Sequence, residues 1–225
     1  MVTVHLLRVF TDELGVHGNE LGVVLDGPSV READRQRLAA ALGYPETVFV
    51  DDAQRAVVRI YSPTGELPFA GHPLVGTAWL LARTGSAPSV LRPPAGEVPT
   101  WRDGDMTWIR ADPQFAPPFE RRRLGTPAEV DAHPGGAEDE LLELWAWEDE
   151  DAGMVRARVF PRPLGIFEDE ATGAAALALG AELGRPLTIH QGVGSRIDVR
   201  PAEEGGLVEI GGRVERVETR DYALT

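Results

Sequence analysis

The chain has no cysteine and no lysine among its 225 residues. Without cysteine it has no thiol nucleophile, and it can form neither the two-thiol site of a racemase nor an iron–sulfur cluster nor a cysteine zinc site. All 22 residues of the lysine and arginine class are arginine. A Schiff base with a carbonyl substrate or with pyridoxal phosphate is therefore excluded, as is a Walker A lysine.

Acidic residues outnumber basic ones by 36 to 22, so the formal net charge is −14. Such a surface repels nucleic acid and anionic membranes, so we expect neither as a partner, although a small anionic substrate can still be bound locally. No apolar run has the length of a membrane span, and residues 1–10 lack the basic region and cleavage signature of a signal peptide. We therefore expect a cytoplasmic protein.

The usual cofactor motifs are missing too. Gly192-Val-Gly194 lacks the third glycine of a dinucleotide site, and there is no Gly-x-Ser-x-Gly elbow. The five histidines show no metal-ligand spacing. We expect no metal, nucleotide or other cofactor.

Two similar segments, residues 69–85 and 165–184, stand out among what is present. Each has a glycine turn, at Gly71 and Gly173, followed by an apolar run that predicts a buried helix, at about 73–83 and 173–183. The N-terminus of a helix offers unpaired N–H groups and partial positive charge, so two such ends facing one cleft would bind a carboxylate. The alternative is that both are ordinary core helices.

The rest of the chain reads as short strands and turns. Ser29 and Glu32 have the spacing of a capping box for a helix that stops at Gly43, the stretch 126–140 has the composition of a loop, and Gly211-Gly212 reads as a turn. Each half is thus a run of strands with one buried helix, which indicates an α+β fold. Strands are predicted at 3–10, 21–25, 44–50, 57–61, 107–110, 143–147, 155–160, 187–191, 196–200, 207–210 and 214–217.

Three side chains are candidates for chemistry. His72 lies in the first glycine turn, Glu46 follows a proline at a strand start, and Asp169 comes four residues before Gly173. Carboxylates, an imidazole and backbone donors suffice for proton transfer at carbon. The alternatives are a capping histidine and plain surface acids, which is where most acids lie.

These residues belong to longer motifs. In chain order the motifs are Gly18-Asn19, Pro45-Glu46-Thr47-x-Phe49, Leu67-Pro-Phe-Ala-Gly-His-Pro73 with Gly76-Thr77-Ala78, Arg158-Val-Phe160, Gly165-Ile-x-Glu168-Asp169-x-Ala171-Thr172-Gly173-x-Ala175, Gln191-Gly192 and Val208-Glu-Ile-Gly-Gly212. Together they resemble the PhzF family of phenazine-biosynthesis-like isomerases. The likeness covers both ends of the chain and leaves roughly 111–152 poorly matched.

The resemblance implies a diaminopimelate-epimerase-like fold, in which two similar domains each wrap a curved, mostly antiparallel sheet round a central helix. The domains would be 1–118 and a shortened 119–225, joined near 111–125, and the final strand would return to the first domain. The active site would lie between the domains. A homodimer is a possible assembly.

The resemblance also implies roles for the site residues and a reaction. Glu46 would move a proton between ring carbons, and His72 and Asp169 would position and polarise the substrate. The backbone around four further residues would bind the substrate carboxylate: Gly71, Thr172, Gly173 and Ala174. The implied activity is a cofactor-independent isomerisation, an allylic proton shift in a small cyclic or unsaturated amino or hydroxy carboxylic acid of secondary metabolism; in the phenazine member the substrate is a dihydro-hydroxyanthranilate.

Two residues depart from the family pattern. Ala174 stands where serine is common, and Glu170 replaces the usual proline. One alternative is therefore a catalytically impaired relative that binds a small carboxylate. Another is a lyase or hydrolase that uses the same acids. Retention of Glu46, His72 and Asp169 favours the isomerase, because a pure binding protein has no use for an unpaired buried acid.

Overall fold

The computed structural model describes residues 1–223. The helices are α1 (Glu32–Leu42), α2 (Gly71–Arg83), α3 (Pro127–Ala132) and α4 (Gly173–Leu183), with 3-10 turns η1 (Gly27–Ser29), η2 (Pro113–Phe115) and η3 (Arg162–Leu164). The strands are β1 (Val2–Thr11), β2 (Asn19–Val24), β3 (Glu46–Asp52), β4 (Val57–Tyr61), β5 (Glu66–Leu67), β6 (Val90–Leu91), β7 (Val98–Asp103), β8 (Met106–Ala111), β9 (Glu120–Arg123), β10 (Leu141–Asp149), β11 (Met154–Pro161), β12 (Leu187–Gln191), β13 (Ser195–Pro201) and β14 (Val208–Tyr222).

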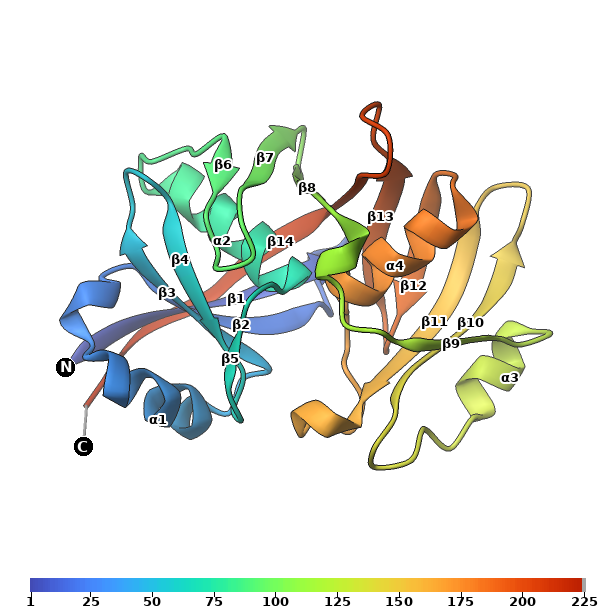
Figure 1. Cartoon of the computed structure of the whole chain (residues 1–225), viewed down its shortest axis with the longest axis horizontal. Coiled ribbons are helices and arrows are strands. Elements are labelled where there is room, and N and C mark those ends of the chain that lie inside the picture. The colour runs from blue at the N-terminus through green and yellow to red at the C-terminus, as the bar shows by residue number, and fades with distance from the viewer. Residues whose placement is uncertain (224–225) are drawn as a thin grey trace.

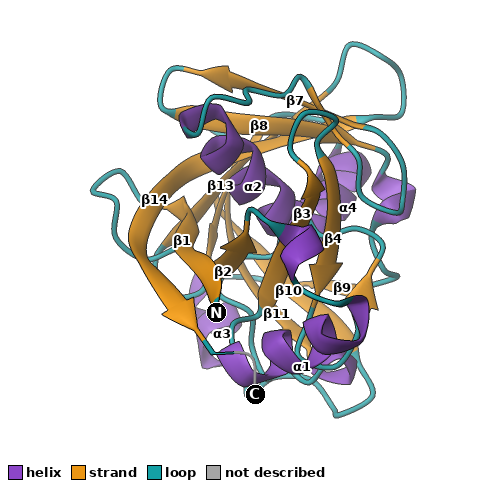
Figure 2. Cartoon of the chain, turned by 90° about the vertical axis from the view of Figure 1, so that its left-hand side faces the viewer, coloured by secondary structure: helices purple, strands orange, loops and turns teal. Residues whose placement is uncertain are grey.

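One curved sheet runs through both halves of the chain, in the order β5-β4-β3-β2-β1-β14-β13-β12-β11-β10-β9, and β8 also pairs with β14 (Figure 1). Most neighbouring strands are antiparallel, which confirms the expected α+β class. Strand β14 holds the halves together, because its start pairs with β13 and β8 and the rest of its length pairs with β1. Figure 2 shows the strands of the first half curving around α2.

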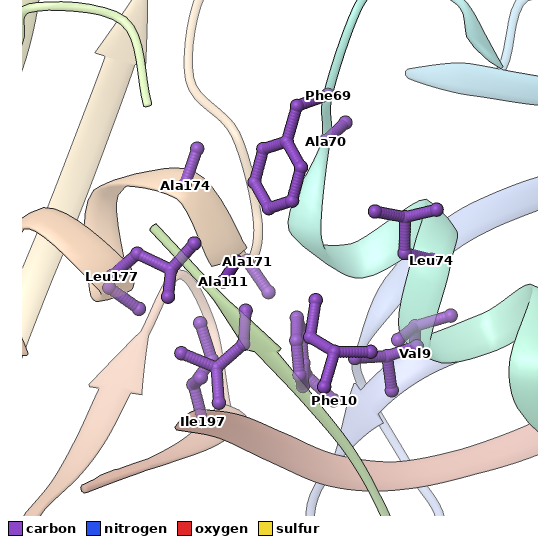
Figure 3. Close-up of a cluster of buried hydrophobic side chains, with 14 of the residues drawn as sticks. Val9, Phe10, Phe69, Ala70, Leu74, Ala111, Ala171, Ala174, Leu177 and Ile197 are labelled. Atoms are coloured by element: carbon purple, nitrogen blue, oxygen red, sulfur yellow. The ribbon is translucent and has the colours of Figure 1, made fainter. Parts of the chain in front are cut away.

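The two glycine-led helices lie at the centre of this arrangement, as the sequence predicts. The first eleven residues of α2 are all buried, and most of α4 is buried as well. A helix that is apolar all round must be enclosed by other elements, and here the sheet encloses both. Their starts share one hydrophobic cluster, in which Phe69 and Ala70 lie across from Ala174 and Leu177 (Figure 3).

The predicted turn at Gly211-Gly212 is wrong, because both glycines lie inside the continuous strand β14. A Cβ at Gly211 would come within 2.3 Å of the Trp108 ring, and one at Gly212 within 2.3 Å of the Phe10 ring. Glycine is needed there because large side chains pack directly onto the strand backbone, which sequence alone does not distinguish from a turn.

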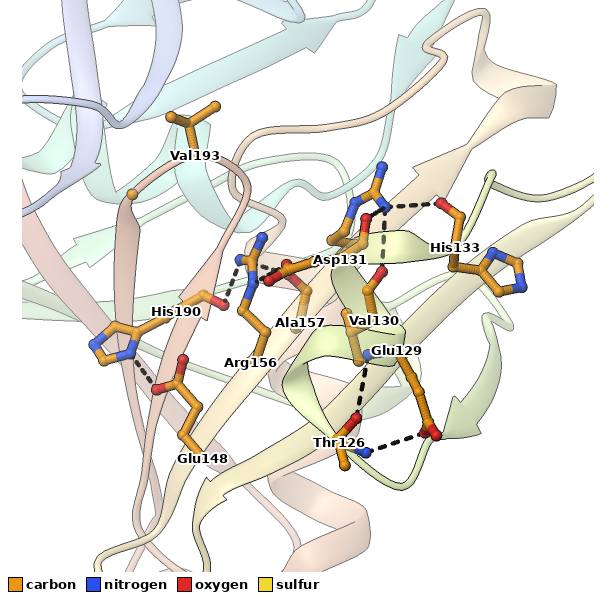
Figure 4. Close-up of polar contacts among 12 residues, drawn as sticks. Thr126, Glu129, Val130, Asp131, His133, Glu148, Arg156, Ala157, His190 and Val193 are labelled. Atoms are coloured by element: carbon orange, nitrogen blue, oxygen red, sulfur yellow. Dashed lines mark hydrogen bonds and ion pairs between the residues drawn. The ribbon is translucent and has the colours of Figure 1, made fainter.

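Two predictions about helix starts are also corrected. Ser29 caps no helix, since its hydroxyl donates to the Asp26 carbonyl within η1, and α1 begins after Arg31 without a side-chain cap. The predicted loop 126–140 contains α3, which has a complete capping box between Thr126 and Glu129 (Figure 4). A helix forms despite the loop-like composition because the capping box satisfies the first free N–H groups of this short helix.

We keep the division into domains 1–118 and 119–225 as a proposal, with the junction at 111–125. There β8 ends, and only η2 and the short strand β9 follow before α3. Within residues 1–223, no helix has the length and apolar character needed to cross a bilayer.

Candidate active site

A cavity of about 230 Å³ lies where the starts of α2 and α4 meet. It contains every one of the seven residues that the sequence singles out for the site. Its lining is Glu46, Leu67, Pro68, Phe69, Ala70, Gly71, His72, Phe115, Ala116, Pro117, Phe119, Pro161, Leu164, Ile166, Asp169, Thr172, Gly173 and Ala174. The helix starts therefore face one cleft, as the carboxylate-site argument requires.

The two helix N-termini touch through glycine. A Cβ at Gly71 would lie 2.8 Å from the Gly173 Cα, and a Cβ at Gly173 would lie 2.9 Å from the His72 amide nitrogen. No side chain caps either helix. Uncapped N–H groups and two partial positive charges therefore converge on the cavity wall, which is a favourable place for an anionic oxygen.

Glu46 and His72 form a close buried pair on this wall. Glu46 begins β3 and His72 is the second residue of α2, and Glu46 Oε2 lies 3.2 Å from His72 Nε2. The two atoms are near enough for an ion pair but lack hydrogen-bond geometry, and neither has another partner in the described chain. Neither atom is thus committed to a hydrogen bond with another protein group among residues 1–223.

Burial controls the charge of this pair. Burial raises the pKa of Glu46 well above its usual range, and the charge of Asp169 raises it further. Burial also lowers the pKa of His72 to about 3, against a smaller opposing effect of the Glu20 backbone. Near neutral pH His72 is therefore a neutral imidazole, and Glu46 holds its proton far more firmly than a surface glutamate does.

Asp169 is the second buried carboxyl of the site. Its Oδ1 accepts a hydrogen bond from Asn19 Nδ2 at 2.6 Å, and its Oδ2 accepts one from the Thr172 hydroxyl at 2.6 Å. Burial raises the pKa of Asp169 to about 6, while these two hydrogen bonds act in the opposite direction. The site therefore holds two buried carboxyls whose pKa values are both raised, with protein hydrogen bonds opposing the rise at Asp169 and the charge of Asp169 adding to it at Glu46.

The segment that carries Asp169 is held in place by Arg158 of β11. The guanidinium donates to both Glu168 carboxylate oxygens, at 2.8 and 2.7 Å. It also donates to the carbonyls of Val130, Asp131 and His133 at the end of α3, the helix shown in Figure 4. The Asp169 amide then bonds to the Val159 carbonyl at 2.9 Å, so the carboxyl enters the cavity from a fixed backbone.

Residues 7–139, more than half of the chain, match the family model described as phenazine biosynthesis-like protein. The chain belongs to this family. A trans-2,3-dihydro-3-hydroxyanthranilate isomerase of Pseudomonas fluorescens is 29% identical in an alignment that covers 79% of this chain and 81% of that protein.

Solved structures agree with this membership at the level of the fold. A phenazine biosynthesis protein of the PhzF family from Bacillus anthracis superposes with a TM-score of 0.81 at 20% identity and covers 99% of both chains. A hydroxyproline epimerase from Agrobacterium vitis gives a TM-score of 0.63 at 16% identity and covers 97% of this chain and 91% of that one. The PhzF-like fold expected from the sequence motifs is thus confirmed.

Two polar residues of this PhzF-family site receive no role in the sequence-based assignment. Asn19 bonds to Asp169 and, at 2.9 Å, to the Ala171 carbonyl. Gln191 spans the same turn, since its Nε2 donates to the Asp169 carbonyl at 2.8 Å and its Oε1 accepts from the Thr172 amide at 3.1 Å. Their presence in the motifs Gly18-Asn19 and Gln191-Gly192 is the signal that could have identified them.

Sequence reasoning also missed the apolar wall of this cavity. It is formed by the side chains of Leu67, Phe69, Phe115, Phe119, Leu164 and Ile166. They come from three separate segments of the chain, at 67–69, 115–119 and 164–166, so no local pattern marks them as neighbours. This wall excludes water from the carboxyls and offers a surface for the apolar face of a ligand.

The described residues hold no group of three or more histidine, aspartate and glutamate side chains placed to bind a metal ion. Asp169 has both of its carboxylate oxygens in hydrogen bonds to protein donors. The cofactor-free reaction expected from the sequence stays a prediction.

Proposed function

We propose that this chain is a cofactor-independent isomerase that moves a proton between two carbons of a small cyclic or unsaturated amino or hydroxy carboxylic acid. The observation that carries the proposal is a buried carboxyl, that of Glu46, whose Oε2 has no hydrogen-bond partner in the described chain and lies beside a neutral imidazole in the cavity where two uncapped helix starts meet. The name of the Pseudomonas fluorescens relative, an isomerase of a dihydro-hydroxyanthranilate, supports the same substrate class.

The substrate carboxylate would bind at the paired helix starts, among the amides near Gly71 and Gly173. Gly71 and Gly173 are the first residues of α2 and α4, and both line the cavity. Asp169, held as an acceptor by Asn19 and Thr172, would accept a hydrogen bond from the substrate amino or hydroxy group. Binding at both ends would fix the carbon skeleton over Glu46.

Glu46 would carry out the proton transfer. Its ionised form takes a proton from one carbon, the electron pair of that C–H bond shifts across the adjoining double bond, and the carboxylic acid returns the proton at the far carbon. The reaction consumes nothing and regenerates the carboxylate. The raised pKa of Glu46 helps because a carboxylate with a higher pKa is a stronger base. Neutral His72 would polarise the substrate without adding charge.

The first test is to find a substrate and follow the proton. Cyclic amino and hydroxy acids are screened by thermal shift, and hits are incubated in heavy water with the parent and with Glu46→Gln. We expect deuterium in the product of the parent reaction, and nearly complete loss of turnover with retained binding in the variant, because the amide keeps the shape but cannot accept the proton.

Two other outcomes separate the alternatives. Turnover of a confirmed substrate by Glu46→Gln at the parent rate would make the acid/base assignment wrong, with Asp169 as the next candidate. Tight binding of a carboxylic acid without turnover or deuterium exchange in the parent would favour the impaired binding protein. The observation that favours a binding protein as the second candidate is Ala174, which lines the cavity without the hydroxyl of the serine that is common at this position.

We also propose a cytoplasmic location and a homodimer as its assembly. Cell fractionation and light scattering of the purified protein test the two statements separately.

A further inference from the structure

Glu170, the residue that replaces the usual proline of the family motif, lies directly beside Asp169. Its carboxylate accepts hydrogen bonds from the Val193 amide at 3.0 and 2.9 Å and from the Gly194 amide at 3.3 Å. It also accepts one from the Ser195 hydroxyl at 2.8 Å. The tight turn between β12 and β13 is therefore built around a negative charge.

Glycine at position 192 makes this arrangement possible. Gly192 has a φ of +60°, and a Cβ there would lie 2.2 Å from Glu170 Oε2. On the far side of the turn, a Cβ at Gly194 would lie 2.5 Å from the His17 ring. The turn is thus packed between the Glu170 carboxylate and the segment that leads into β2.

A chain of hydrogen bonds returns from this turn to the active site. The buried Ser195 hydroxyl, which donates to Glu170, accepts from the Gly18 amide at 3.0 Å. Gly18 precedes Asn19, whose side chain donates to Asp169 at 2.6 Å. The carboxylate of Glu170 therefore reaches Asp169 by two routes, directly as a neighbouring charge and indirectly through Ser195, Gly18 and Asn19.

The two routes act on Asp169 in opposite directions. The nearby charge of Glu170 raises the pKa of Asp169, whereas the hydrogen bond from Asn19 lowers it. The other titratable groups around Asp169 are Glu46 of β3 and His72 of α2, of which the first has its own pKa raised by the charge of Asp169 and the second is neutral near pH 7. The two contributions to the pKa of Asp169 have opposite signs, so removing one or the other shifts the Asp169 titration in opposite directions.

We propose that Glu170 is a positioning residue of the active site, which fixes Asn19 through Ser195 and Gly18 and sets the charge and orientation of Asp169. Only the effect of Glu170 on turnover rests on the proposed function. Its effect on Asp169 is a property of the protein without a ligand and can be tested without a substrate.

The test is a titration of the Asp169 side-chain carboxyl by NMR in protein labelled with ¹³C-aspartate, assigned with Asp169→Asn. Glu170→Gln removes the charge but keeps an acceptor for the turn, so we expect the Asp169 titration midpoint to move to lower pH. Ser195→Ala keeps the charge but breaks the link to Gly18, so we expect the midpoint to move to higher pH because Asn19 donates less well.

Glu168→Gln is the matched control. It removes an acid from the other side of Asp169, but that acid is already paired with Arg158 at 2.7 Å. We expect it to leave the Asp169 midpoint unchanged even if it lowers stability. Opposite shifts in Glu170→Gln and Ser195→Ala support the proposal, and any other pattern in folded protein overturns it. Once a substrate is known, the acid limb of the kcat/KM pH profile should shift in the same directions as the Asp169 midpoint. If the NMR midpoints shift as expected but the kcat/KM profile does not, the proposed function is wrong and the positioning role of Glu170 stands.

Discussion

Gly173→Ala tests whether the two helix starts must touch for the site to exist. A methyl group at position 173 would lie 2.8 Å from the Gly71 Cα and 2.9 Å from the His72 nitrogen. Ordinary Cβ contacts begin at about 3.4 Å, so the helix starts would have to separate by about 0.6 Å. Both neighbours are backbone atoms, so no side-chain rotation can relieve the overlap.

The size of the effect follows from two opposing contributions. Alanine favours a helix by up to about 1 kcal/mol relative to glycine, whereas inserting a methyl group into a well-packed interior costs about 1 to 3 kcal/mol. Because the overlap is with backbone, we expect a net loss of about 1 to 2 kcal/mol in the free energy of unfolding. For a chain of this size that lowers Tm by roughly 2 to 8 °C.

The assay combines thermal unfolding with binding of a carboxylic acid found in the substrate screen. We expect binding to weaken as well, because moving the amides away from the ligand lengthens their hydrogen bonds. The control is Gly65→Ala, since a Cβ at Gly65 would meet no atom within 4 Å; its Tm and ligand affinity should stay near those of the parent. A Gly173→Ala protein that is at least as stable as the parent and binds equally well would refute the argument.

Three further predictions concern Glu143, Ala174 and the absence of a metal requirement. Glu143 is buried with no partner for Oε2, and burial raises its pKa to about 8 from 4.5; its contribution to stability is thus present below pH 4.5 and lost as the pH rises to about 8. One unit of pKa corresponds to about 1.36 kcal/mol, so Glu143→Gln should raise the free energy of unfolding by about 3 kcal/mol at pH 7 and change it very little at pH 4. Equal denaturation midpoints of the variant and the parent at pH 8 would contradict this. Ala174→Ser should tighten carboxylate binding by about 1 kcal/mol in calorimetry, since it adds one hydrogen-bond donor at the α4 start; weaker binding would mean that the carboxylate lies elsewhere. Chelators should leave turnover unchanged, and a loss that added metal restores would end the cofactor-free proposal.

The sequence by itself determined the features that depend on neighbouring residues. Helix α4 begins and ends where its glycines and apolar run predict, and α2 ends as predicted but begins at Gly71, two residues before the predicted start, because caps and helical periodicity act within a few residues. The same holds for the α+β class, since short alternating runs with turns between them leave few other architectures. Family motifs added the pairing of Glu46, His72 and Asp169 in one site.

Local reasoning failed where a residue has its partner far along the chain. Gly211 and Gly212 look like a turn in sequence, but they are glycines because Trp108 and Phe10 pack onto them. Asn19 is 150 positions away from the Asp169 carboxyl to which it donates. No spacing rule predicts such contacts, because they arise only when the sheet places distant strands side by side.

The tertiary structure alone decided the chemistry of the site. As free side chains, Glu46 and Asp169 would both be ionised and His72 would titrate close to neutral pH. Enclosure by the apolar wall and by the two touching helix starts raises the pKa of both acids and lowers that of the imidazole. The physical reason is desolvation: the sequence supplies the titratable groups, but only the folded chain removes the water that would otherwise keep them alike.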